Sequence, residues 1–156
     1  MNKDHAGVFV PPPIIFALPL LAAVFVNSRL PWPIATGHGT TLMVGGFIAI
    51  VIGVSIGLAS VFSFRAVRTT VLPVGRPTTA IVERGPYRFT RNPMYLAMAL
   101  AYVGVSLLLN NAWAIVLLPA VLLVIDVFVI RREERYLAAK FNESYRSYCA
   151  RVRRWI

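Results

Sequence analysis

Charged residues are few in this chain, and acidic residues are fewer still. They make up 14% of the 156 residues, against 58% hydrophobic residues, with 6 Asp or Glu and 16 Lys or Arg. A soluble globular domain carries about 25% charged residues, so we predict a membrane protein. The one cysteine, Cys149, excludes an internal disulfide and is expected to serve packing. The histidines His5 and His38 lie in separate segments, and we therefore predict no His/Cys metal site.

Three long stretches are almost free of charge: 6–28, 30–64, and 92–130, the last with Asp126 alone. A membrane helix needs about 20 apolar residues, and the amides Asn110 and Asn111 favour a turn that divides the last stretch in two. We therefore predict an all-α integral membrane protein with four transmembrane helices, followed by a cytoplasmic amphipathic helix, in a single domain over 1–156. The predicted helices are 12–26, 41–64, 93–110 and 112–130.

The first stretch has an alternative interpretation as a cleaved signal peptide. The uncharged run is long, Pro11-Pro12-Pro13 is unusual for the apolar part of such a peptide, and no small-residue cleavage site stands out. We therefore treat it as a helix of the protein.

The basic residues are unequally divided between the two ends of the predicted helices. With four spans, the segment 65–91 and the tail after Ile130 fall on the same face, together with Lys3, and Arg29 lies opposite. The positive-inside rule places this face and both termini in the cytoplasm. Membrane lipids are thus expected partners, whereas nucleic acid, which would need a soluble basic surface, is not. The residues of this face are Arg65, Arg68, Arg76, Arg84, Arg88, Arg91, Arg131, Arg132, Arg135, Lys140, Arg146, Arg151, Arg153 and Arg154.

The segment 65–92 is too long and polar for a simple connection, and loops of this length are often functional. Residues 78–82 are rich in β-branched side chains and favour an extended conformation, and a turn is expected at Gly85-Pro86. Asn92 is expected to cap the next helix, with Pro93 at its first position, leaving backbone N–H groups to face an anion.

The C-terminal segment carries apolar residues at helical spacing, at Leu137, Phe141, Tyr148 and Val152. One turn earlier, the same stripe reaches Glu133. A carboxylate on an inward face at the membrane boundary requires a cation or a hydrogen-bond donor. Asp126 lies seven residues before Glu133 and is expected on the same side of the helix.

Gly53 and Gly57 form a Gly-x-x-x-Gly pair that allows two helix backbones to approach closely. The pair predicts either a homodimer through the second helix or a contact between helices of one chain.

Two polar clusters thus adjoin lipid on one side: the arginine-rich turn 85–95 and the sequence Arg131-Arg132-Glu133-Glu134-Arg135. Arginine and a helix start suit an anion, and glutamate suits an amine or ribose hydroxyls. S-Adenosylmethionine carries these groups, as do many other zwitterions.

Two motifs in these clusters resemble the isoprenylcysteine carboxyl methyltransferase and phospholipid methyltransferase superfamily of integral membrane enzymes. They are Gly85-x-Tyr87-x-x-x-Arg91-Asn92-Pro93-x-Tyr95 and Glu133-Glu134-x-x-Leu137-x-x-x-Phe141-x-x-x-Tyr145. The resemblance implies S-adenosylmethionine bound on the cytoplasmic side in a cofactor region, 78–156, whereas the helices within 12–64 match only as hydrophobic spans. The implied cofactor-binding residues are Thr79, Ala80, Ile81, Val82, Tyr87, Arg91, Asn92, Pro93, Met94, Tyr95 and Glu133.

The chain departs from this superfamily at two positions. Asn92 stands where histidine is often found, and Val129 stands where the eukaryotic prenylcysteine enzymes place an arginine that contacts substrate. Arg131 and Arg132 lie one turn nearer the cytoplasm. As catalytic residues we predict Arg132, which suits a carboxylate acceptor, and Glu134, which suits removal of a proton from an ammonium acceptor.

The predicted function is therefore methyl transfer from S-adenosylmethionine to a lipophilic acceptor in the membrane. The acceptor could be an isoprenylcysteine-like carboxylate, a phospholipid amine or another small lipid. Two alternatives belong to other classes: a membrane reductase that uses a nicotinamide cofactor, and a membrane adaptor without enzymatic activity.

Overall fold

The computed structural model describes residues 10–36, 39–67 and 79–156, and these contain helices and no strand. Some of the sequence-based expectations fall on Lys3, His5, His38, Arg68, Arg76 and Thr78, which lie outside the described residues. The elements are the α-helices α1 (Pro12–Arg29), α2 (Gly39–Ala66), α3 (Pro93–Leu108), α4 (Ala112–Ile125) and α5 (Arg131–Arg151), the 3-10 helix η1 (Gly85–Arg88) and the π-helix η2 (Asp126–Ile130).

The all-α prediction is confirmed, and the helix boundaries lie close to the predicted ones. The turn between α3 and α4 falls at the two amides. Asn110 has a positive φ of 47°, and Asn111 caps α4 by accepting a hydrogen bond from the backbone N–H of Ala114 at 3.3 Å. The expected extended segment forms no strand in its described part, 79–82, and continues into η1.

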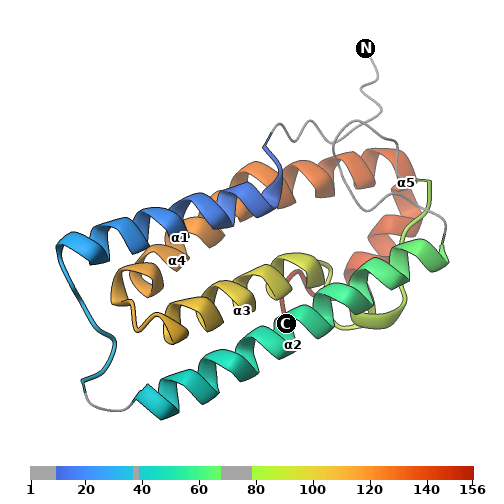
Figure 1. The fold of residues 1–156 in the computed structure, drawn as a ribbon. Helices are drawn as coiled ribbons and strands as arrows, with labels where there is room; N and C mark the ends of the chain where they lie inside the picture. Colours follow the sequence, from blue (N-terminus) through green and yellow to red (C-terminus); the bar gives the residue numbers. More distant parts are fainter. Residues whose placement is uncertain (1–9, 37–38, 68–78) are drawn as a thin grey trace.

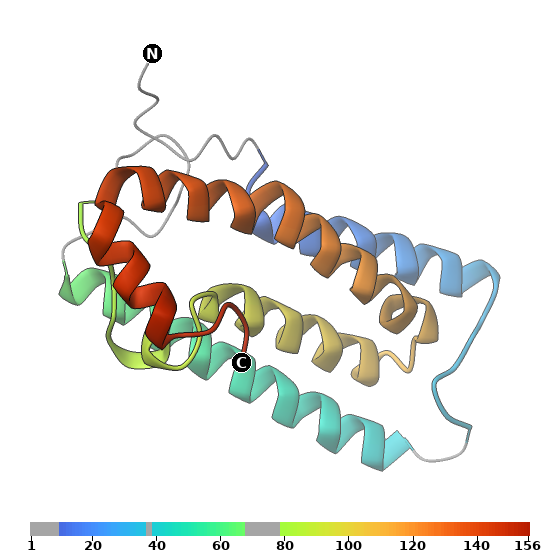
Figure 2. The same cartoon turned by 180° about the vertical axis from the view of Figure 1, so that it is seen from behind.

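The helices pack in two pairs, α1 against α4 and α2 against α3, and α3 also contacts α1 and α4 (Figures 1 and 2). The α2–α3 contact is made at backbone level, because a Cβ built on Gly53 would lie 2.8 Å from the Ala97 carbonyl oxygen. The Gly-x-x-x-Gly pair therefore serves a contact within the chain. A homodimer stays a prediction, and it would have to use another face of α2.

The outer surface of the bundle is apolar. Large side chains on α1 and α2 are exposed, among them Leu21 at 64% and Phe47 at 65%. The helices α1 and α2 and the helical segment Ala112–Arg151 are long and apolar enough to cross a membrane, while α3, with 16 residues, is shorter. At 1.5 Å per residue α3 measures about 24 Å, less than the ~30 Å of a bilayer core.

The helical segment that begins at Ala112 changes geometry twice, at the end of its apolar part and within α5. At η2 the N–H of Arg131 donates to the carbonyl of Asp126, a π-type hydrogen bond. At Asn142, φ is 42° and ψ is −113°, which breaks α5 into two helical parts. The second part folds back toward α2 and α3 (Figure 2). The apolar stripe is confirmed, because Leu137, Phe141, Cys149 and Ile81 pack around buried Tyr145, Tyr148 and Val152.

Candidate active site

The end of α2, the start of α3 and the α4–α5 junction meet at one end of the bundle (Figure 1). Here η1 turns the chain from the irregular segment into α3. Gly85 has a φ of +56°, and a Cβ on it would lie 2.5 Å from the hydroxyl oxygen of Ser63 in α2. The positive φ favours glycine, and a side chain here would also displace the Ser63 hydroxyl. The predicted turn is therefore held directly against a neighbouring helix.

The two predicted motifs meet at Tyr95 and Glu133. The Tyr95 hydroxyl donates a hydrogen bond of 2.8 Å to Glu133 Oε1, across 38 residues of sequence. Glu133 lies just beyond the apolar segment that ends at Ile130. Burial raises the pKa of its carboxyl to about 7; the hydrogen bond from Tyr95 lowers this pKa and the charge of Glu134 raises it. Tyr95 is thus the donor that the inward-facing carboxyl required.

Tyr87 lies close to this pair. Its ring packs edge to face on Phe64 at 5.3 Å between centroids, and its carbonyl accepts a 2.8 Å hydrogen bond from the Tyr148 hydroxyl. Burial raises the pKa of the Tyr87 hydroxyl, and the charge of Glu133 adds to the rise. Buried Tyr87 and Tyr95 and half-buried Glu133 therefore form one polar group.

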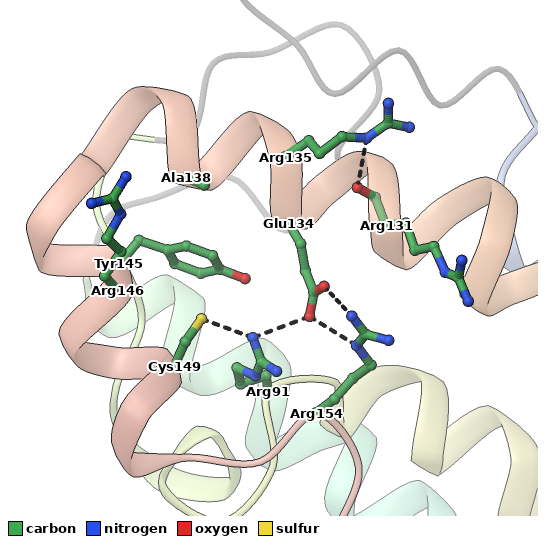
Figure 3. Close-up of a pocket in the computed structure, with 9 residues that line it drawn as sticks. All are labelled: Arg91, Arg131, Glu134, Arg135, Ala138, Tyr145, Arg146, Cys149 and Arg154. Atoms are coloured by element: carbon green, nitrogen blue, oxygen red, sulfur yellow. Dashed lines mark hydrogen bonds and ion pairs between the residues drawn. The ribbon is translucent and has the colours of Figure 1, made fainter.

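Glu134, the next residue, belongs to a separate charged network. Its Oε1 and Oε2 accept hydrogen bonds from Arg154 Nε and Nη2 at 3.0 and 2.6 Å, so both oxygens are occupied, and Arg91 Nη1 forms an ion pair with Oε1 at 3.1 Å (Figure 3). Arg154 Nη1 also lies 3.3 Å from Asp126 Oδ1, and Arg131 Nε lies 2.9 Å from Asp126 Oδ2. Two carboxylates thus share three guanidinium groups.

The expectation that Asp126 shares a helix side with Glu133 is wrong. Asp126 groups with Glu134 instead, through Arg154. In a regular α-helix of 3.6 residues per turn, positions seven apart lie almost in line. The π-helical turn inserts about one extra residue, which brings positions eight apart into line.

Asn92 does not cap α3 with its side chain. Its Nδ2 donates to the carbonyl of Arg154 at 2.9 Å, while its backbone carbonyl accepts from the N–H groups of Tyr95 and Leu96, each at 3.1 Å. The first-turn N–H group of Tyr95 therefore does not face a ligand, contrary to the expectation. Pro93 does stand at the start of the helix, as predicted.

An open pocket of 430 Å³ adjoins the network around Glu134 (Figure 3). Besides Glu134, its polar lining includes Arg91, whose Nε is buried and has no hydrogen-bond partner, and Cys149, whose sulfur lies 2.7 Å from Arg91 Nη1. An unpartnered buried N–H is costly, so it favours an anionic group at this position. The lining residues are Arg91, Arg131, Glu134, Arg135, Ala138, Tyr145, Arg146, Cys149 and Arg154.

The predicted site residues divide between this pocket and the packed interior. Arg91 and Glu134 line the pocket, whereas Val82, Asn92 and Pro93 are buried. Ile81 packs on the aromatic cluster of α5, and Met94 is half-buried in the first turn of α3. Thr79 and Ala80 lie in the irregular segment before η1, and Arg132, in the first turn of α5, does not line the pocket.

Sequence reasoning missed the roles of Arg154, Tyr145 and Cys149 in this pocket. Arg154 is one of several arginines in the tail, and its neighbour Arg153 looks the same in sequence. The sequence signal is that the acidic pair Glu133-Glu134 needs cations nearby. This signal does not distinguish Arg153 from Arg154.

The residues at this end fit the groups of S-adenosylmethionine. The buried Nε of Arg91 is a donor suited to the carboxylate of its methionine part. The Glu133 carboxyl has a second oxygen beside the one that Tyr95 contacts, and it suits an ammonium group or ribose hydroxyls. Arg91 lies just before α3, and Glu133 lies in the first turn of α5.

Comparison with known proteins places the chain in a methyltransferase class. The profile of the phospholipid methyltransferase family matches residues 41–144, which is more than half of the chain, so the chain belongs to this family. The matched residues include both motifs up to Ser144 and thus confirm the resemblance.

The comparisons with individual proteins and with solved structures say less about function than the family match does. A protein of Haemophilus influenzae (strain ATCC 51907 / DSM 11121 / KW20 / Rd), described as an uncharacterized protein, is 43% identical over 63 residues, covering 40% of this chain and 100% of that protein. No solved structure matches the chain.

Proposed function

We propose that this protein transfers a methyl group from S-adenosylmethionine to a lipophilic acceptor at the cytoplasmic surface of a membrane. The observation that carries the proposal is the contact between the two motifs: Tyr95 with Glu133 at 2.8 Å, and Arg91 with Glu134 at 3.1 Å. Membership of the phospholipid methyltransferase family supports methyl transfer over reduction by a nicotinamide cofactor and over a purely structural role.

The donor, when bound, supplies an electrophilic methyl group on its sulfonium. In the proposed site Arg91 binds the donor carboxylate and Glu133 binds its ammonium or ribose. The tyrosines that surround Glu133 reduce its contact with water. Positioning of two reactants contributes about 7–11 kcal/mol in well-oriented systems, so alignment by these side chains is the main contribution we assign to the protein.

The charges of the pocket favour an acceptor with a negative group. Five arginines and one glutamate line it among the described residues. An ammonium acceptor would need a base, and both oxygens of Glu134 already accept hydrogen bonds from arginines. A carboxylate acceptor arrives ionised, and a phospholipid brings its phosphate. We therefore propose that Glu134 holds Arg91 and Arg154 in place and that Arg131, which lines the pocket, contacts the acceptor. A contact of the acceptor with Arg132, which lies outside the pocket lining, stays a prediction from the sequence.

The membrane topology in this proposal follows from the apolar outer surface and the basic end. The exposed side chains of α1 and α2 face lipid, and the arginine-rich end lies on the cytoplasmic side. The pocket then opens at the level of lipid headgroups, because Arg131, which lines it, directly follows Ile130, the last residue of the apolar segment.

Calorimetry of the purified protein in detergent tests this function. We expect binding of S-adenosylhomocysteine and none of a reduced nicotinamide dinucleotide. Glu133→Ala should weaken S-adenosylhomocysteine binding by about tenfold or more, the effect of removing one charge-assisted hydrogen bond. Glu143→Ala is the matched control, since Glu143 lies on α5 with a 77% exposed side chain.

Two results would contradict the proposal: no binding of S-adenosylhomocysteine by the unaltered protein, or equal binding by the Glu133→Ala and Glu143→Ala variants. Incubation of lipid extracts with a labelled methyl donor then identifies the acceptor. A labelled phospholipid or prenylated carboxylate would agree with the arginine-lined pocket, and a labelled neutral lipid would not.

A further inference from the structure

The last residues of the chain, 152–156, form a strap across the start of α3. The carbonyl of Arg153 accepts from the Arg91 N–H at 3.0 Å. The carbonyl of Arg154 accepts from the Thr90 hydroxyl at 3.1 Å and from Asn92 Nδ2 at 2.9 Å. Val152 and Trp155 anchor the strap on either side, in the aromatic cluster of α5 and against the core of α1, α3 and α4. The strap lies outside the family match, which ends at residue 144.

The side chain of Arg154 reaches the opposite wall of the pocket. It makes a bidentate pair with Glu134 and a third contact with Asp126, from α5 and η2 respectively. Bidentate guanidinium–carboxylate pairs fix geometry as well as adding energy. Arg154 is therefore the one residue in the described parts of the chain that binds α3's start through its backbone and the α4–α5 junction through its side chain.

We infer that Arg154 is a positioning residue for methyl transfer, an inference that rests on the proposed function. Its carbonyl fixes the Thr90–Asn92 segment and its guanidinium fixes Glu134, so it sets the distance between the two motifs. Glu134 in turn holds Arg91, the proposed carboxylate ligand of the donor. Displacement by about 1 Å can reduce a reaction rate by about 100-fold, so a single connection of this kind has a large effect on catalysis.

The test compares S-adenosylhomocysteine affinity among variants in detergent. Arg154→Gln should weaken binding about tenfold, because Glu134 and Arg91 are no longer held in place by a charge-assisted hydrogen bond. Arg154→Lys keeps the charge but cannot form the bidentate pair, so it should restore part of the affinity. Arg153→Gln removes the same charge from the same strap while keeping the backbone carbonyl, and it should bind normally.

A double-mutant cycle separates positioning from general structural support. If Arg154 acts through Glu134, the effects of Arg154→Gln and Glu134→Gln on S-adenosylhomocysteine affinity should not add. The double variant should then have the same affinity as the single variant that binds more weakly. Additive effects would overturn the inference. Equal affinity of Arg154→Gln and Arg153→Gln would also overturn it while leaving the proposed function intact. Absence of binding by the unaltered protein would overturn both.

Trp155 provides a readout that needs no ligand. In a Trp32→Phe, Trp113→Phe background its fluorescence reports whether the strap is docked on the core. We expect a red shift in Arg154→Gln and none in Arg153→Gln. If Arg154→Gln fails to fold, the comparison of Arg154→Lys with Arg153→Gln decides: equal affinity in these two variants contradicts the bidentate requirement.

Discussion

The two ends of the helix bundle are held together by different chemistry. At the end where α3 turns into α4, amides bind backbone groups: Asn110 Oδ1 accepts from the N–H groups of Ile34 and Ala35, and Asn111 Nδ2 donates to the carbonyl of Ala23. At the other end, guanidinium groups bind carboxylates. The first end uses neutral groups whose partners belong to the chain's own backbone. The second uses charged side chains with hydrogen-bonding capacity left over.

Polar groups that still lack a hydrogen-bond partner distinguish a binding site from a contact that only holds helices together. Among the described residues, the buried side-chain atoms without a partner are Arg91 Nε and the Tyr102 hydroxyl oxygen. Neither belongs to the amide end, and Arg91 belongs to the pocket. Substitutions at the amide end should therefore affect stability alone, whereas substitutions at the arginine end should affect ligand binding as well.

The largest effect is expected for Glu134→Ala. Removing this carboxylate leaves Arg91 and Arg154 facing each other without their shared partner. Loss of one partner of a buried ion pair costs about 3–5 kcal/mol, and about 3 kcal/mol is appropriate for this partly exposed group. Thermal unfolding in detergent measures the change, with Glu143→Ala as control. A drop in melting temperature no larger than that of the control would show that the arginines do not depend on Glu134.

An intermediate effect is expected for Asn111→Ala at the amide end. The side chain is 1% exposed, caps α4 and donates to α1, so its loss should cost about 2 kcal/mol. S-Adenosylhomocysteine affinity should stay unchanged in the folded protein. Asn27→Ala is the control, because it removes a single, solvent-exposed hydrogen bond from the backbone N–H of Trp32. A change in ligand affinity in Asn111→Ala would break the distinction between the two ends.

The smallest effect, for a change of one pH unit, is a pH dependence that comes from Glu133. Its folded pKa of about 7 lies above the ordinary value of 4.5, so between these values the folded state binds more protons than the unfolded chain. Stability from this group is complete below the ordinary pKa and is lost as pH rises through the folded pKa, by about 1 kcal/mol per pH unit. Melting temperatures of the unaltered protein and Glu133→Gln across this range measure it. If the two proteins show the same change of melting temperature with pH, Glu133 is not the source of the pH dependence.

Much of the fold follows from charge and turn residues in the sequence. The uncharged stretches predict the helices because a charge inside lipid is costly, and Asn110-Asn111 predicts the turn because asparagine tolerates positive φ. The proximity of Tyr95 and Glu133 follows from the family resemblance and not from spacing. The π-turn at Asp126 and the break at Asn142 have no proline or glycine to signal them. Contacts such as Arg154 with Asp126, 28 residues away, accompany that geometry, and local sequence does not reveal them.

The role of Arg154 could not be predicted for a related reason. Arg153 and Arg154 have the same side chain, and which of them faces Glu134 depends on how the extended residue Val152 directs the chain after α5. Helical periodicity no longer applies there. Arg154, and not Arg153, faces Glu134 because Trp155 packs on the core and orients the strap.

The backbone contact between α2 and α3 limits the routes by which the proposed lipid acceptor can reach the pocket. A Cβ on Gly46 would lie 2.7 Å from the Gly104 carbonyl oxygen, so these helices leave no room even for a methyl group between them. A prenyl or acyl chain therefore cannot pass between α2 and α3 at this contact. For the proposed lipid acceptor, lateral entry is thus confined to the other borders of the bundle.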